Sequence, residues 1–209
     1  MARPLDGADV VFEQRFLKCA GLYRGRIDAI WGPLTNAADV AFHVAAEKIA
    51  CRLGRFDARS ERHIASLQLP AQEAARRFLD RASTARIDVR IISGTRSYAE
   101  QDALYRRGRY GHPGPRVTNA RGGQSRHNFG IAWDIGVFEG GRYLTDPEPY
   151  ERVGAIALED SIAWGGHWRR FIDRPHYELA LGLSVAELRR RFEAGEPFLP
   201  APEAEPLVA

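Results

Sequence analysis

Two segments of the chain are dense in metal-binding residue types, and any fold must bring them together. The first runs from Ser125 to Asp134 and the second from Trp164 to Glu178. They contain His127, Asp134 and His176, two imidazoles and one carboxylate on separate elements. Such a set suits a tetrahedral zinc ion that keeps one open coordination position.

The spacing of the first two candidate ligands restricts the local structure. His127 and Asp134 are an odd number of residues apart, so one straight strand cannot present both side chains on the same face. Gly130 between them allows the chain to change direction. We therefore expect His127 on an incoming loop and Asp134 within a strand over 131–138, whose alternate residues, such as Trp133, face the core.

A second carboxylate precedes the third candidate ligand. Asp173 stands before His176 with Pro175 between them, which predicts a turn that leads into a strand over 177–181. Water activated by zinc needs a neighbouring base to take its proton during attack on an amide, and Asp173 is placed for that role. The charge that grows on the amide oxygen needs a further cation, for which Arg96 is the candidate.

The remaining pattern predicts an α+β chain. The expected helices lie at 10–21, 35–45, 71–85, 98–107, 150–161 and 184–192, and the expected strands at 87–92, 131–138 and 177–181. The glycine- and arginine-rich stretch 108–123 predicts a long loop that borders the site. The polar segment 52–70 predicts a connecting segment with some helix. The end of the chain, with four prolines and little to bury, predicts an extended tail.

Composition excludes several classes of protein. Hydrophobic residues make up 44% of the 209, within the globular range, and no apolar run approaches the ~20 residues of a membrane span. A net charge of +3 is below the dense positive charge of a typical nucleic-acid binder. Cys19 and Cys51 form no C-x-x-C pair, so we expect free thiols. The first residues lack the apolar segment of a secretory signal.

The pattern S-x-H-x-x-G-x-A-x-D, followed by W-G-G-x-W-x-x-F-x-D-x-P-H, resembles the VanY-type zinc peptidase family over about residues 71–182. That family includes D-alanyl-D-alanine carboxypeptidases, dipeptidases and the L-alanyl-D-glutamate endopeptidases of phage endolysins. The resemblance implies an α+β fold in which a small antiparallel sheet has flanking helices. It also implies zinc on His127, Asp134 and His176, with Asp173 as the base and Arg96 as the cation on the oxyanion side.

Three further residues are candidates for binding substrate: Ser125, Gln101 and His167. The lead-in T-N-A-R-G-G-Q-S-x-H and the Asp-x-Pro-His form look most like the L-alanyl-D-glutamate branch. The resemblance therefore implies hydrolysis of the L-Ala-D-Glu bond in peptidoglycan stem peptides. Separately, the arginine content of the 108–123 loop makes Arg116 and Arg121 candidates for holding the D-Glu carboxylate. A D-alanyl-D-alanine carboxypeptidase and a non-catalytic, zinc-stabilised cell-wall-binding protein stay open as alternatives.

The start of the chain resembles a second family. Peptidoglycan-binding-like repeats, which are three-helix modules, share the spacing of Gly25, Ile27, Asp28, Gly32, Thr35, Ala38 and Phe42. We therefore expect a small all-α module at 1–60, with Thr35 capping its second helix, a zinc peptidase domain at 61–194 and a proline-rich tail at 195–209. We expect a monomer without nucleic-acid partners, made in the cytoplasm and reaching the periplasm or wall after lysis or through a secretion system.

Overall fold

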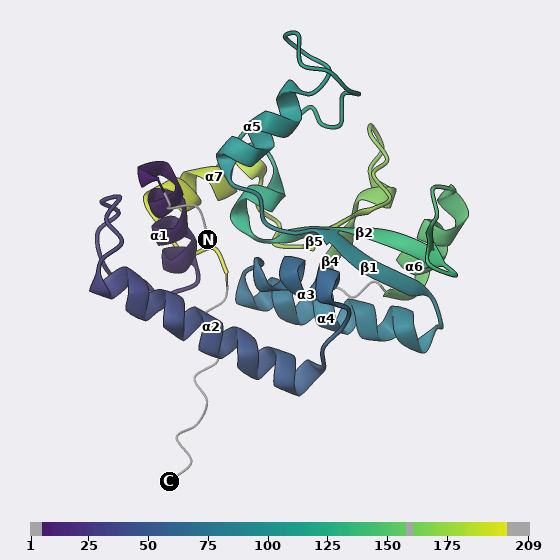
Figure 1. Cartoon of the computed structure of the whole chain (residues 1–209), viewed down its shortest axis with the longest axis horizontal. Coiled ribbons are helices and arrows are strands. Elements are labelled where there is room, and N and C mark those ends of the chain that lie inside the picture. Colours follow the sequence, from purple (N-terminus) through teal and green to yellow (C-terminus); the bar gives the residue numbers. More distant parts are fainter. Residues whose placement is uncertain (1–5, 158–160, 200–209) are drawn as a thin grey trace.

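A computed structural model describes residues 6–157 and 161–199 and shows the expected α+β architecture (Figure 1). One small antiparallel sheet has helices around it. Its strands are β1 (Asp88–Ser93), β2 (Ala132–Glu139), β3 (Arg142–Tyr143), β4 (Ile162–Trp164) and β5 (His176–Leu179). The helices are α1 (Gly7–Cys19), α2 (Pro33–Leu53), α3 (Ala58–Ala65), α4 (Leu69–Thr84), α5 (Tyr98–Arg106), α6 (Pro147–Ala157) and α7 (Val185–Ala194), with the short 3-10 helices η1 (Arg126–Phe129) and η2 (Gly165–His167).

The sheet separates a packed face from a polar face. Its strand order is β1-β2-β5-β4, with β3 paired to β2, and all pairs are antiparallel. Trp133 of β2 and Tyr177 of β5 are completely buried and contact Phe78 of α4. Because side chains alternate along a strand, Asp134 and His176 point to the opposite face. Helix α4 therefore covers the core side, and the candidate ligands lie on the other side.

The N-terminal helices share the same hydrophobic core. Phe16 of α1 contacts Phe42 of α2, with ring centroids 5.4 Å apart, and both belong to the buried cluster that reaches the sheet. Helix α3 spans the expected boundary at residue 60, and the Ser60 hydroxyl accepts a hydrogen bond of 2.9 Å from the Ile91 amide of β1. The core is thus continuous across that boundary. A wall-binding module at 1–60 stays a prediction.

The helices differ from expectation mainly at their ends. The helix expected at 150–161 begins at Pro147, and residues 158–160 lie outside the described part. Thr35 was expected to cap the second helix, but α2 begins at Pro33 and Thr35 lies buried within its first turn. None of the helices in the described part has the length and apolar character that crossing a membrane requires.

The expected tail at 195–209 contains two buried residues. Phe198 and Leu199 are 7% and 9% exposed and join the core. The Phe198 ring lies against Phe129 of η1, with centroids 6.5 Å apart. The expectation that this segment has little to bury is wrong for these two residues, while 200–209 lie outside the described part.

Candidate active site

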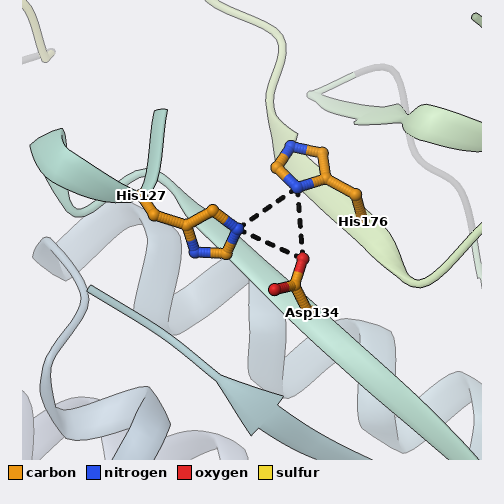
Figure 2. A group of neighbouring side chains, drawn as sticks. All are labelled: His127, Asp134 and His176. Atoms are coloured by element: carbon orange, nitrogen blue, oxygen red, sulfur yellow. Dashed lines mark hydrogen bonds and ion pairs between the residues drawn. The ribbon is translucent and has the colours of Figure 1, made fainter. Parts of the chain in front are cut away.

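Three side chains meet at one point on the polar face of the sheet (Figure 2). Nε2 of His127 lies 3.1 Å from Oδ1 of Asp134, and Nδ1 of His176 lies 3.2 Å from the same oxygen. The two nitrogens are themselves 3.2 Å apart. The three residues predicted as ligands are therefore brought together as a possible metal site.

The local structure explains how the odd spacing is accommodated. His127 lies in η1, which ends at Gly130 with φ 71°, and Asp134 lies within β2. This left-handed turn is the change of direction that the sequence required. His176 is the first residue of β5 and pairs with Asp134 in the sheet register. Two segments far apart in the chain thus place their donors on one face.

The hydrogen bonds around the two imidazoles decide which nitrogens carry hydrogen. Nδ1 of His127 lies 2.7 Å from the Gly94 carbonyl oxygen, and Nε2 of His176 lies 2.9 Å from Oε2 of Glu178. These oxygens only accept, so both of those nitrogens are N–H donors. In the neutral imidazoles the opposite nitrogens then present lone pairs toward Asp134. Three electron pairs converge on one point, an arrangement that a cation stabilises.

The spacing of these donor atoms fits a tetrahedral zinc ion. Zinc bonds of about 2.0–2.1 Å to nitrogen and oxygen place neighbouring ligand atoms about 3.3 Å apart in a tetrahedron. The three observed separations are 3.1, 3.2 and 3.2 Å. The residues present therefore fit zinc in both geometry and donor type.

The charges of the cluster also suit a cation. Burial alone would raise the pKa of Asp134, but His127 and His176 outweigh burial and hold it well below its usual value. Burial lowers the pKa of His127. Burial also works against protonation of His176, yet its hydrogen bonds to Asp134 and Glu178 raise the pKa to about 9. A metal ion at this point would displace that proton, because only the unprotonated nitrogen can be a ligand.

Asp173 lies on the turn expected before β5. Its backbone N–H donates to the Gly165 carbonyl at 3.1 Å, and its own carbonyl accepts from the His176 N–H at 3.2 Å. Burial is the main cause that raises the pKa of the Asp173 carboxyl, and the charge of Asp134 adds to it. A carboxylate with a raised pKa is a stronger base, which suits the predicted role.

Arg96 reaches the same cluster from the turn after β1. Its guanidinium donates to Oδ2 of Asp134 at 3.2 Å and to Oε1 of Gln101 at 3.1 Å. Gln101 is completely buried, and its amide nitrogen donates to the Ala120 carbonyl at 2.9 Å. From this position Gln101 holds Arg96, and its role in binding substrate stays a prediction. Arg96 as the oxyanion-side cation stays a prediction.

The other candidate substrate residues lie near the rim of the site. Ser125 is half-buried at the start of η1, and His167 is exposed in η2, where its ring packs edge-on against Trp164. Their roles in binding substrate stay predictions. Trp168 is 38% exposed, and its ring centroid lies 5.0 Å from that of His176. No spacing rule identifies this residue, because the contact forms only through the tertiary fold.

The stretch 108–123 is irregular, as the sequence predicted, and its arginines contact α5 or the loop itself. The Arg121 guanidinium lies over the Tyr105 ring, 4.9 Å from its centroid. Arg116 donates to the Gly108 carbonyl at 3.4 Å. Binding of a substrate carboxylate by these arginines stays a prediction.

Comparison with known proteins identifies this part of the chain. A family described as D-alanyl-D-alanine carboxypeptidase, within the M15 peptidases, matches residues 118–179, which include all three candidate ligands. This region is similar to the VanY-type peptidases. The chain is 42% identical over 103 residues to peptidoglycan L-alanyl-D-glutamate endopeptidase CwlK of Bacillus subtilis. The match covers 44% of this chain and 61% of that protein, so the chain spans about three fifths of this relative.

A solved structure has a similar fold. The crystal structure of the L-Ala D-Glu endopeptidase ChiX of Serratia marcescens superposes with a TM-score of 0.50 at 23% identity. The match covers 61% of this chain and 91% of ChiX. At this identity the likeness supports the fold, with its small sheet and flanking helices.

Proposed function

We propose that the chain is a zinc-dependent peptidoglycan peptidase that hydrolyses the L-Ala-D-Glu bond of stem peptides. The observation that carries the proposal is the convergence of lone pairs from His127, Asp134 and His176 beside a second carboxyl, that of Asp173. A purely structural metal site needs no such neighbouring base. This favours hydrolysis over the non-catalytic alternative.

The proposed chemistry divides among the residues of the site. When bound to the three ligands, zinc would polarise the scissile carbonyl and acidify water. Asp173 takes the proton of the attacking water and later delivers it to the leaving amine. Arg96, held by Gln101, supplies positive charge where the carbonyl oxygen becomes negative.

The relatives support the choice of bond. CwlK and ChiX are both named as endopeptidases for the L-Ala-D-Glu linkage. The description of the matching family supports a second candidate, a D-alanyl-D-alanine carboxypeptidase. The products of the two reactions differ, so analysis of the fragments separates them.

The test combines metal analysis of the purified protein with fragment masses from digested peptidoglycan. Wild type should contain about one zinc per chain and release fragments cut between L-Ala and D-Glu. Asp173→Ala should retain zinc and lose at least about 100-fold in rate, as expected when a general base is removed. Asp80→Ala changes an exposed aspartate on α4 and is the matched control, with wild-type activity.

Two outcomes would overturn the proposal. Release of free D-alanine with intact L-Ala-D-Glu linkages would establish the carboxypeptidase instead. Equal, negligible hydrolysis by wild type and Asp173→Ala, with zinc bound in both, would favour the non-catalytic wall-binding protein.

We also propose that the N-terminal helices bind the cell wall, where the substrate lies. The loop before α2 and the start of that helix carry exposed apolar residues, with Ile30 66%, Trp31 38% and Leu34 68% exposed. Co-sedimentation with purified peptidoglycan tests this in the Asp173→Ala background, which does not digest the wall. Adding Trp31→Ala should reduce the bound fraction, and unchanged binding would argue against this surface.

A further inference from the structure

Glu178 is a buried carboxylate next to the candidate metal ligands. It lies two residues after His176 on β5, so both side chains project from the same face of the strand, while Tyr177 between them enters the core. Opposite Glu178 in the sheet register is Ala132, whose small side chain leaves room for a carboxylate. Only 6% of Glu178 is exposed, which makes an unpaired charge there costly.

Both carboxylate oxygens of Glu178 have a partner. Oε2 accepts the Nε2–H of His176 at 2.9 Å, and Oε1 forms an ion pair of 3.0 Å with Nε of Arg126. Arg126 also donates to the Leu183 carbonyl at 2.7 Å. A continuous chain of hydrogen bonds therefore runs from the candidate ligand His176 to the segment before α7.

This ion pair connects the two segments that supply the imidazoles. Arg126 directly precedes His127 in η1, and Glu178 follows His176 in β5. Holding Arg126 against Glu178 therefore restricts how far the two imidazoles can separate. It also fixes the tautomer of His176, because a carboxylate at Nε2 requires the hydrogen there and leaves the lone pair on Nδ1.

We propose that Glu178 and Arg126 are positioning residues that preorganise the two histidines for the metal ion. The inference rests on the metal site of the proposed function and adds a role for two residues outside the ligand set. Glu178 orients His176 directly, and Arg126 acts through Glu178. Partners of ligating histidines contribute about 10–100-fold to metal affinity in other proteins.

The test measures zinc affinity, which does not depend on peptidase activity. Metal-free protein competes with a chromophoric chelator for zinc, and the dissociation constant is compared between variants. Glu178→Gln should weaken zinc binding about 10–100-fold, because the neutral carboxamide accepts more weakly from His176 and turns a donor toward its neighbours. Glu151→Gln is the matched control, because Glu151 pairs with Arg174 at 2.9 Å but its side chain is 54% exposed. The zinc affinity of this variant should stay within about twofold of that of wild type.

A second readout separates positioning from general support of the fold. The visible absorption of cobalt bound in place of zinc reports ligand geometry, and it should change in Glu178→Gln and stay unchanged in Glu151→Gln. If Glu178→Gln does not fold by circular dichroism, Arg126→Lys replaces it. Lysine keeps the positive charge but loses the planar fork, so zinc affinity should fall by more than about twofold.

Folded variants with wild-type zinc affinity and an unchanged cobalt spectrum would overturn the inference while leaving the proposed function intact. Lower thermal stability with unchanged affinity would overturn it equally, since that result assigns Glu178 to the fold alone. If wild type itself binds neither metal, the proposed function fails first.

Discussion

Replacing Gly130 with alanine tests how the N-terminal helices support the active site. Gly130 ends η1 at φ 71°, directly after the helix that carries His127. A Cβ at this position would lie 2.5 Å from Cε2 of Phe16 in α1 and 3.0 Å from Cγ of Gln68. The Gly130 carbonyl also accepts from the Gln68 amide at 2.8 Å, so the turn has little freedom to move away.

Two energetic costs add at this position. The left-handed conformation costs an L-residue about 1–2 kcal/mol, and forcing a methyl group into packed surroundings costs a further 1–3 kcal/mol or so. Gly130→Ala should therefore lower the free energy of unfolding by about 2–5 kcal/mol. Gly21→Ala is the matched control, because its φ is 76° and nothing lies within 4 Å of the added Cβ. It should lose only about 1–2 kcal/mol.

Urea unfolding measures the free energy of unfolding of both variants, and a zinc titration of each folded variant measures its dissociation constant. Relief of the strain should move η1, so Gly130→Ala should also bind zinc more weakly than Gly21→Ala. The reasoning is refuted if the two variants lose the same stability and bind zinc equally, because the contact between α1 and this turn would then contribute nothing.

Three further predictions concern other parts of the chain. Burial, followed by neighbouring carboxylates, raises the pKa of Glu13 from 4.5 to about 7. The folded state therefore binds this proton more tightly than the unfolded state, and the free energy of unfolding falls as the pH rises from 4.5 to about 7. Glu13→Gln should therefore gain up to about 3 kcal/mol over wild type between pH 5 and 8 in urea unfolding, and a constant difference would contradict the assignment. A Cβ on Gly165 would collide with the Asp173 carbonyl, so Gly165→Ala should lower kcat more than it weakens zinc binding; unchanged kcat would show that this turn tolerates the shift. If Arg116 and Arg121 hold the D-Glu carboxylate, changing both to alanine should raise KM for defined muropeptides and leave kcat similar, whereas unaltered KM would remove them from the binding site.

The ligand set could be read from the sequence because it depends on local rules. Alternation along β2 placed Trp133 in the core and Asp134 on the opposite face. Gly130 allowed the change of direction that places His127 on the segment before β2. Pro175 likewise predicted the turn before β5. Each of these inferences needed only a short stretch of chain and the geometry of strands and turns.

The surroundings of the site could not be read in the same way. The burial of Glu178 depends on its ion pair with Arg126, which comes from a distant segment of the chain. The three-residue strand β4 is too short to leave a periodic pattern. Some helix was expected within 52–70, but the mostly polar composition of that segment does not indicate where α3 begins and ends. Phe198 has no apolar neighbours in the tail except Leu199, and its contact with Phe129 exists only once η1 has formed.

The position of α1 affects how the expected boundary near residue 60 should be understood. Phe12 of α1 contacts Phe192 of α7, with centroids 5.3 Å apart, and Phe192 contacts Phe129 in η1 at 5.6 Å. Phe16 on the same helix lies against Gly130 at the end of η1. Because η1 carries His127, these contacts couple the folding of α1 to the geometry of the candidate ligands. An N-terminal segment that binds the wall would therefore also stabilise the catalytic site, and the two functions would share one core.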